Sequence, residues 1–396
     1  MSSQRLPTFQ DLILPYSHET FLGEFWERKP LCIKRANPKH YEGLLDRREL
    51  HRLLSFTWIN RRDARIVKDG EPDPERIIFD DEGRASPLAL MAAYADGYTI
   101  VINNLQSRHR ETSFLSRGLE MFFRQPIGAN VYLTPAHASG LRPHFDDHDA
   151  FVLQLEGSKE WRLYGFAAEQ PLRGEHFDVD ASTLGDAKQI VRLEPGDLLY
   201  LPRGLVHAAQ STDTSSLHLT LGLSSFSWVD LLKEALALRA RNELPLRFTL
   251  PPSPDGQAAW CREILSQATE RSIGDLYPFL SDAITQIDIK FISTLSPLDD
   301  GGLESLDTLD QTTISSRFRH RLGTICCVHT TELDSRLYFP GNVVTFPKRV
   351  PEVLDFVASH DSFAARELPD VIDDASKLNV VRKMVIAGLL VPEHDN

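Results

Sequence analysis

The chain of 396 residues is long enough for two or three domains, and 42% hydrophobic residues supply ordinary cores. Its 43 Lys and Arg against 56 Asp and Glu give a net charge of −13, which opposes general attraction to nucleic acids or anionic membranes. No stretch has the roughly 20 apolar residues of a membrane-spanning helix, and residues 1–19 lack the apolar core of a secretory signal. We therefore expect a cytoplasmic protein that does not bind membranes.

The first hundred residues mix helical and extended patterns. Phe21–Trp26 and Arg48–Leu54 are typical of helices, and Pro30–Arg35 is typical of a strand. Residues 61–78 are charged and contain two prolines, which predicts that much of this stretch is an exposed loop. A β-branched run at Tyr98–Ile102 indicates a buried strand.

Strands dominate the next part of the chain. Two turns punctuate it: Glu156–Lys159 predicts a tight hairpin, and Glu194–Asp197 is a Pro-Gly turn. Antiparallel strands at this spacing indicate a sandwich or a barrel. The five predicted strands are Asn130–Thr134, Ala150–Leu155, Glu160–Tyr164, Asp197–Leu201 and Leu217–Leu221.

The pattern becomes helical after the last of these strands. Ser227 is a plausible cap for a helix that runs towards Arg241 with apolar residues near helical spacing. Breaker clusters follow at Ser253–Gly256 and Ser296–Gly302, and the second is the better domain boundary.

Beyond that boundary, short strands precede one long helix. The strands are predicted at Cys326–His329 and Val343–Phe346, and the helix at Ala375–Ala387. This order suggests a small winged-helix-like unit.

The strongest functional pattern is His144-Phe-Asp146, followed by His207 at a distance of 61 residues from the aspartate. Residues two apart in an extended segment point to the same side, so His144 and Asp146 can face one point. His207 lies just past the predicted strand Asp197–Leu201, where the chain can bring its imidazole to the same point. Two histidines and one carboxylate hold a non-haem ferrous ion by one face and leave the opposite face open. The pattern predicts an iron oxygenase with these three residues as catalytic metal ligands.

Other interpretations of this pattern stay open from the residues alone. Such a pair and a distant histidine also arise by chance, and zinc sites of two histidines and one aspartate exist, although no cysteine joins the set. Asp147, His148 and Asp149 continue the acidic run. We expect these three at the rim of the site and not among the ligands.

Two longer stretches carry a family resemblance. Residues 143–164, PHFDDHDAFVLQLEGSKEWRLY, together with residues 194–207, EPGDLLYLPRGLVH, resemble the JmjC-type cupins of the ribosomal oxygenase group. Residues 25–34, FWERKPLCIK, resemble the N-terminal strand of that group. With the helical and winged-helix-like tail, the similarity extends over nearly the whole chain.

The resemblance implies an α+β fold built on a double-stranded β-helix, the JmjC or cupin jelly-roll barrel. It implies iron(II) bound by His144, Asp146 and His207, 2-oxoglutarate as co-substrate and dioxygen as oxidant. Lys159, 15 residues after the first histidine, would meet the distal carboxylate of 2-oxoglutarate. By itself Lys159 is a turn lysine, although a hairpin beside an apolar strand can aim its charge into a barrel.

The resemblance also places Asn130 and His218 beside the co-substrate. Alone, the first would be a strand-end asparagine and the second a satisfied core histidine. Gly222 departs from the pattern, because some relatives have serine there. One hydrogen bond to the co-substrate is therefore in doubt, with Thr220 and Tyr132 as candidates to replace it.

The same resemblance divides the chain by role. Residues 1–224 would be the JmjC catalytic domain, residues 225–299 a helical dimerisation region and residues 300–396 a winged-helix-like domain. Residues 301–396 hold 10 Lys and Arg against 14 Asp and Glu, a net of −4, so we expect no direct DNA binding. The implied assembly is a homodimer, although the helix from Ser227 can equally pack on its own domain.

Substrates in this group are typically arginine or histidine side chains of ribosomal proteins. An acidic rim made by Asp147 and Asp149 would suit a basic protein segment. Three alternatives stay open: a peptide or small-molecule hydroxylase of the same chemistry, a catalytically silent cupin scaffold, and a cupin enzyme that uses no 2-oxoglutarate.

Overall fold

The computed structural model describes residues 5–73, 77–175, 177–247, 249, 276–298, 302–348 and 350–393. Contacts within the chain divide it into two compact units, residues 1–225 and residues 226–396. The predicted breaker at Ser253–Gly256 lies outside the described residues. None of the helices within the described ranges combines the length and the apolar character needed to cross a lipid bilayer.

The first unit contains an antiparallel sheet of eight strands. At its centre β11 (Ser216–Leu223) pairs with β5 (Ile127–Thr134) on one side and with β6 (Asp149–Glu156) on the other. The strand order is β1-β9-β6-β11-β5-β4-β2-β3, and the remaining bounds are β1 Leu31–Ile33, β9 Leu198–Leu201, β4 Thr99–Ile102, β2 Ala64–Lys68 and β3 Glu71–Pro72.

A second sheet contains β10 (Leu205–Ser211), β7 (Lys159–Phe166) and β8 (Gln189–Leu193), with β7 in the middle. Isolated bridges from Ser139 to Gln210 and from His144 to His207 lay residues 139–144 along the other edge of β10. All five strands that the sequence predicts after residue 130 are present in the two sheets.

The predicted hairpin at Glu156–Lys159 was wrong. Strand β6 pairs with β11 and β9, whereas β7 pairs with β10 and β8, so this turn carries the chain from one sheet to the other. Gly157 has a φ of +62°, and a Cβ there would lie 1.7 Å from the carbonyl oxygen of Ser215, so only glycine fits. The Pro-Gly turn at Glu194–Asp197 is confirmed, and it returns the chain from β8 to β9.

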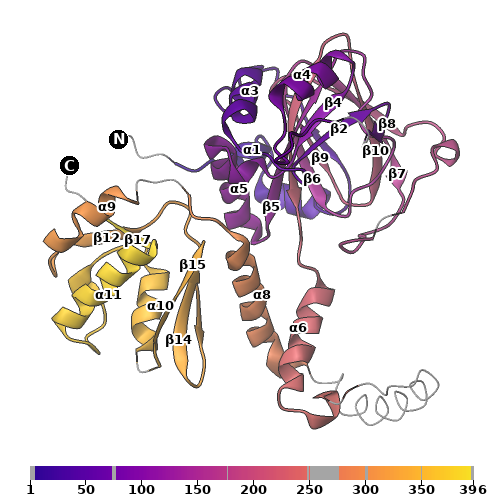
Figure 1. The fold of residues 1–396 in the computed structure, drawn as a ribbon. Helices are drawn as coiled ribbons and strands as arrows, with labels where there is room; N and C mark the ends of the chain where they lie inside the picture. Colours follow the sequence, from indigo (N-terminus) through magenta and orange to yellow (C-terminus); the bar gives the residue numbers. More distant parts are fainter. Residues whose placement is uncertain are drawn as a thin grey trace. The chain divides into compact units, whose positions relative to one another are not determined.

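Alternate residues of the large sheet face two different layers, as the period of a strand requires. The leucines of β11 join a core that includes α1 (Phe9–Ile13) and α5 (Arg110–Phe123), which lie beside the sheet (Figure 1). On the opposite face, Ala150 and Val152 of β6 pack with Trp161 and Leu163 of β7. The two sheets therefore face each other, and the space between them can hold a site.

The N-terminal region contains more regular structure than expected. Residues 61–78 are not simply a loop, because β2 runs through them with Ile66 and Val67 buried and pairs with β4. Within the strand, the charged residues Arg65 and Lys68 are the exposed ones. The helix predicted at Phe21–Trp26 is a short α-helix that continues as a π-helix; the helical bounds are α2 His18–Thr20, the π-helix Phe21–Phe25, α3 Arg47–Phe56 and α4 Pro87–Ala95.

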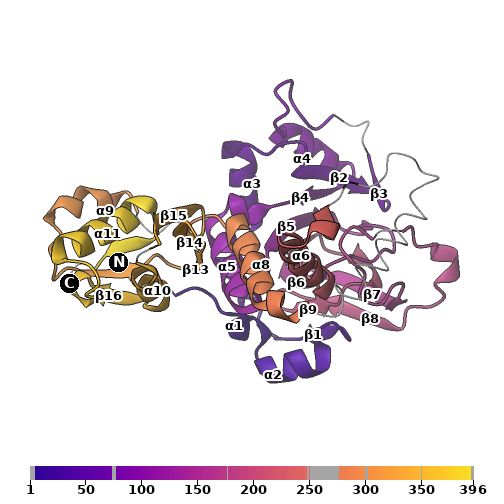
Figure 2. The same cartoon turned by 90° about the horizontal axis from the view of Figure 1, so that it is seen from below.

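The second unit begins with the predicted helix. Helix α6 (Trp228–Ala240) starts at a capping box made by Ser227 and Asp230, and α8 (Leu280–Thr294) lies beside it (Figures 1 and 2). Ala235 and Ala283 are fully buried between these two helices.

The C-terminal part combines small sheets with helices. Its predicted strands and long helix are confirmed as β13 (Cys327–Thr330), β15 (Asn342–Pro347) and α11 (Asp374–Ala387). The remaining elements are α9 Glu304–Asp307, β12 Arg317–His320, β14 Asp334–Phe339, α10 Pro351–Ser359, β16 Ser362–Ala364 and β17 Leu390–Pro392.

Candidate functional site

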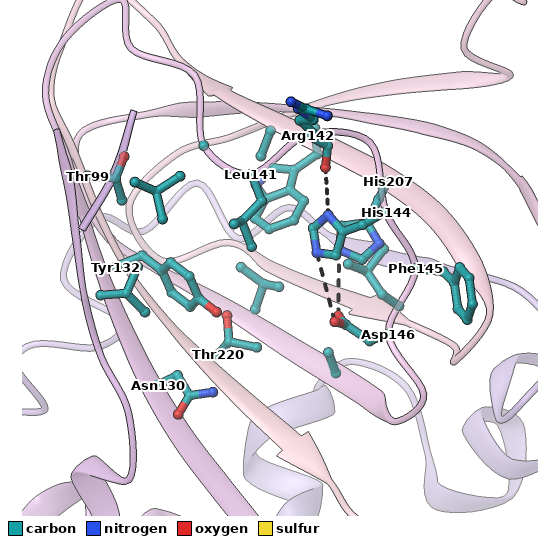
Figure 3. A pocket seen from close by; sticks show the side chains of 18 of the residues that line it. Thr99, Asn130, Tyr132, Leu141, Arg142, His144, Phe145, Asp146, His207 and Thr220 are labelled. Atoms are coloured by element: carbon teal, nitrogen blue, oxygen red, sulfur yellow. Dashed lines mark hydrogen bonds and ion pairs between the residues drawn. The ribbon is translucent and has the colours of Figure 1, made fainter. Parts of the chain in front are cut away.

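His144, Asp146 and His207 meet at one point. One possible ligand atom from each lies within 4.8 Å of the others. The Nε2 atoms of His144 and His207 are 3.8 Å and 3.7 Å from the two carboxylate oxygens of Asp146 (Figure 3). His207 lies within strand β10, not just past a strand as expected, and its backbone exchanges two hydrogen bonds with that of His144.

Backbone carbonyls orient both imidazoles. Nδ1 of His144 is 2.7 Å from the carbonyl oxygen of Arg142, and Nδ1 of His207 is 3.0 Å from that of Leu205. A carbonyl can only accept, so each Nδ1 carries the proton and donates it. Both Nε2 lone pairs therefore face Asp146 and are available to a metal ion.

The electrostatics of the site keep Asp146 and His207 in the forms that bind metal. Burial raises the pKa of the Asp146 carboxyl, but the nearby imidazoles, His148 first among them, outweigh burial and hold it below its ordinary value. Burial, with His144 beside it, lowers the pKa of His207 to about 4. At neutral pH the carboxylate is ionised and His207 is neutral, as ligands must be.

A cavity of about 580 Å³ opens in front of the triad, between the two sheets. Its walls include Val67, Val152 and Leu201 from the large sheet and Trp161 from the small one. Asn130, Lys159 and His218, the three residues expected to contact a co-substrate, all line it. The structure thus brings every predicted site residue to one cavity.

Lys159 is the buried cation of this cavity. Its side chain is 2% exposed, and its Nζ donates to Oγ1 of Thr134 at 3.0 Å. No carboxylate within the described part of the chain forms an ion pair with it, and burial lowers its pKa to about 7. A buried ammonium without a counter-ion is costly, so this end of the cavity fits an anionic ligand.

The two sheets place Lys159 and the triad at different depths. Lys159 is in register with Ser211, and Leu163 is in register with His207, so four residues separate the two levels. That spacing is roughly 13 Å along a strand. The lysine and histidine side chains span part of it, which leaves a length suited to a short dicarboxylate.

His218 and Asn130 line the same cavity from the large sheet. The ring of His218 is parallel to that of Tyr132, with centroids 4.7 Å apart, and its buried Nδ1 has no hydrogen-bond partner among the described residues. Burial, with Lys159 nearby, holds the pKa of His218 well below its ordinary value. The Asn130 side chain accepts from the backbone N–H of Asn104 at 3.2 Å.

Gly222 leaves room for His148. A Cβ at Gly222 would lie 2.6 Å from Cδ2 and 2.7 Å from Nε2 of that imidazole. In register, Gly222 lies between Gly128 and Ala150, so this part of the sheet has no side chain larger than a methyl group. Any residue with a side chain at position 222 would therefore displace the His148 ring from its present position.

Of the three residues expected at the rim, His148 lines the cavity, whereas the acidic rim expected from Asp147 and Asp149 was wrong. Asp149 is fully buried, and its Oδ1 accepts a hydrogen bond of 2.6 Å from the hydroxyl of Tyr200. Asp147 accepts from the N–H of Gly174 at 2.6 Å and contacts Nδ1 of His148 at 3.2 Å. Both carboxylates serve internal contacts, and the charged groups that line the cavity besides the triad and Lys159 are Arg65, Arg142 and Asp178.

Sequence reasoning missed Thr134 and Arg65. Thr134 follows Asn130 and Tyr132 at intervals of two, so strand parity indicated that it shares their face. Arg65 was missed because much of residues 61–78 was predicted to be an exposed loop. The backbone carbonyls of Arg142 and Leu205 leave no signal in a sequence.

The donor set fits ferrous iron and a keto acid. Two neutral imidazole nitrogens and one carboxylate on one side of an ion form the 2-His-1-carboxylate arrangement of non-haem iron. The buried ammonium and Thr134 hydroxyl can accept a carboxylate some distance away. Among the residues that the structure describes, no cysteine joins the group.

Comparisons with known proteins agree with this site. A family model described as JmjC domain matches residues 105–231. Ribosomal oxygenase 2 from Mus musculus is 35% identical over 254 residues, which cover 61% of this chain and 54% of that protein. The bifunctional lysine-specific demethylase and histidyl-hydroxylase NO66 of Culex quinquefasciatus is 35% identical over 244 residues, 59% of this chain and 37% of that protein. The chain spans about half or less of the length of these relatives.

Solved structures show the same fold. Escherichia coli ycfD has a TM-score of 0.58 at 19% identity, with 96% of this chain and 99% of that chain covered. The same protein, described as a ribosomal oxygenase, was solved in complex with cobalt and 2-oxoglutarate, and that structure has a TM-score of 0.52. The JmjC or cupin fold expected from the sequence is confirmed. The chain therefore contains a JmjC domain, at residues 105–231.

Proposed function

We propose that this chain is an iron(II)- and 2-oxoglutarate-dependent oxygenase that hydroxylates a protein side chain. One observation carries the proposal: a 2-His-1-carboxylate cluster lines the same cavity of about 580 Å³ as a buried ammonium that forms no ion pair with any described residue. A structural metal site would not need the ammonium, and a lone anion site would not need three convergent ligands. The complex of the E. coli neighbour with cobalt and 2-oxoglutarate supports the same assignment.

Each residue has a defined task in this proposal. His144, Asp146 and His207 hold the metal, and Lys159 with Thr134 holds the distal carboxylate of the keto acid. Bound iron, 2-oxoglutarate and dioxygen would together yield succinate, carbon dioxide and one oxygen atom inserted into a C–H bond of the substrate. Val67, Val152 and Leu201 add apolar surface beside the proposed co-substrate site.

The substrate we propose is an arginine or histidine side chain of a ribosomal protein. The names of the relatives, ribosomal oxygenase 2 and histidyl-hydroxylase NO66, support this class. The corrected charge pattern weakens the argument from an acidic rim, because Asp147 and Asp149 make internal contacts.

We further propose that the chain acts as a cytoplasmic homodimer joined through α6, in the helical region 225–299. One stripe of this helix packs on α8, and a second stripe with Trp228, Val229, Leu232 and Leu236 is exposed, Trp228 at 78%. Exposed apolar stripes of this kind mark protein interfaces. The winged-helix-like assignment for residues 300–396, without direct DNA binding, stays a prediction.

Mass spectrometry of ribosomal proteins tests the proposed function. Cells that lack the chain are complemented with the wild type or with Asp146→Asn, and tryptic peptides are searched for a single added oxygen. We expect one histidine or arginine to gain oxygen only with the wild type. Ribosomes identical in the two strains would contradict a ribosomal substrate and redirect the search to peptides and small molecules.

A further inference from the structure

The backbone of residues 202–205 forms hydrogen bonds with two of the three proposed ligands, Asp146 and His207. The N–H of Gly204 donates to the backbone carbonyl of Asp146 at 2.9 Å, and the carbonyl of Leu205 accepts from Nδ1 of His207 at 3.0 Å. Gly204 has a φ of +82°, and a Cβ there would lie 2.0 Å from the carbonyl oxygen of Ala168. The position of this short segment therefore sets the spacing between Asp146 and His207.

The side chain of Arg203 anchors that segment. Its Nη2 lies 2.8 Å from Oε1 of Glu27, and its Nη1 lies 3.8 Å from Oδ2 of Asp149. The hydroxyl of Tyr200 completes a ring of contacts, because it donates to Asp149 at 2.6 Å and accepts from the N–H of Glu27 at 2.9 Å. We call Arg203, Glu27, Asp149 and Tyr200 the Arg203 clamp.

The clamp is mostly buried, although Glu27 is 32% exposed, and it is separate from the cavity. Arg203 is 13% exposed and Asp149 is 0% exposed, yet none of the four residues lines the cavity. A buried ion pair adds little net stability over a well-packed apolar group, because desolvation cancels most of the attraction. What such a pair provides is a fixed geometry, and Arg203 is adjacent to the residue that binds the Asp146 carbonyl.

We propose that Arg203 is a positioning residue for the metal centre, acting on Asp146 through Gly204 and on His207 through Leu205. The inference rests on the proposed function, since it requires a metal ion at the triad. Loss of the guanidinium frees the segment, so the two ligands no longer hold one spacing. Residues behind metal ligands typically change metal affinity about 10- to 100-fold when removed.

Cobalt(II) binding to the purified full chain tests this role. The affinity is measured by calorimetry and the ligand geometry by the visible spectrum of the bound ion, for the wild type, Arg203→Met and Arg203→Lys. We expect Arg203→Met to weaken cobalt binding by at least about tenfold and to alter the spectrum. Arg203→Lys should recover part of the affinity, because an ammonium can pair with one of the two carboxylates but cannot bridge them.

Arg117→Met is the matched control. Arg117 forms another buried ion pair, with Glu120 at 3.0 Å, on α5 and away from residues 202–205. We expect this variant to lose stability but to keep the cobalt affinity and spectrum of the wild type. If Arg203→Met does not fold, Glu27→Gln, which keeps the shape of the clamp and removes one charge, takes its place.

Three results would overturn the inference. The first is an unchanged cobalt affinity and spectrum in folded Arg203→Met, or in Glu27→Gln where that variant replaces it. The second is an equal loss of affinity in Arg117→Met, which would make the effect one of general stability. The third is a wild type that binds no cobalt at the triad; this result alone would also overturn the proposed function.

Discussion

Substitution of Lys159 tests the proposed anion site of the cavity independently of the metal ligands. The structure buries this ammonium at 2% exposure with a single hydroxyl partner, and burial lowers its pKa to about 7. The unfolded chain has the ordinary value of about 10.4, so it binds more protons than the folded chain between pH 7 and 10. Stability of the metal-free protein must therefore rise with pH across this window.

The size of the effect follows from the two pKa values. Between pH 6 and pH 9 the lysine should add about 2–3 kcal/mol to the free energy of unfolding, at about 1.4 kcal/mol per pKa unit. That is a large part of the 5–15 kcal/mol typical of a folded protein. Lys159→Met should be more stable than the wild type at pH 6 and lose most of this advantage by pH 9. Urea denaturation of both proteins in a chelator measures it, with exposed Lys188→Met as control.

Binding of 2-oxoglutarate to the manganese-loaded protein completes the test. A carboxylate needs the charged lysine, so above pH 7 binding takes up a proton and should weaken by up to about tenfold per pH unit. Lys159→Met should bind at least about 30-fold more weakly, because breaking a buried charge pair costs about 2–5 kcal/mol. Equal affinity in Lys159→Met and the wild type, or a difference in stability that does not change with pH, would refute the reasoning.

Substitutions at three further sites, Gly222 with its neighbour His148, Gly70 and Trp228, have definite outcomes. Gly222→Ala should lower the free energy of unfolding by about 1–3 kcal/mol, because the new methyl group displaces His148. In the double variant, His148→Ala should suppress most of that loss. Additive losses of stability in urea denaturation would contradict the contact. Gly70 has a φ of +86°, and a Cβ added there would lie 2.9 Å from the backbone nitrogen of Arg142, so Gly70→Ala should displace Arg142. Because the carbonyl of Arg142 orients His144, calorimetry should find weaker cobalt binding. Unchanged binding would count against this link. Trp228→Asp should convert a dimer to a monomer in sedimentation velocity, and a wild type that already sediments as a monomer would remove the proposed interface.

Much of the site follows from strand parity. His144 and Asp146 lie two residues apart, and Asn130 and His218 lie on inward positions of β5 and β11, so local pattern and resemblance together placed them in one cavity. Local pattern did not reveal which strands pair. The turn at Glu156–Lys159 has hairpin chemistry, yet its two strands belong to different sheets, because their partners come from residues far along the chain.

The sequence also did not reveal which charged residues are buried. Asp149 resembles a rim residue in the sequence, but a tyrosine and an arginine more than 50 residues later enclose it. The exposed charges of β2 likewise concealed a strand in which Ala64, Ile66 and Val67 are buried. In both cases tertiary partners decide the environment, and residue type alone does not identify those partners.

The most direct measurement is release of labelled carbon dioxide from 1-carboxyl-labelled 2-oxoglutarate by the purified chain, with ribosomal proteins present. Wild type, Asp146→Asn and the neighbouring control Asp147→Asn are compared with and without ferrous iron. We predict release that requires iron, is lost in Asp146→Asn and persists in Asp147→Asn. Release without iron, or equal release from Asp146→Asn and the wild type, would contradict the assignment of His144, Asp146 and His207 as the iron centre of a 2-oxoglutarate oxygenase.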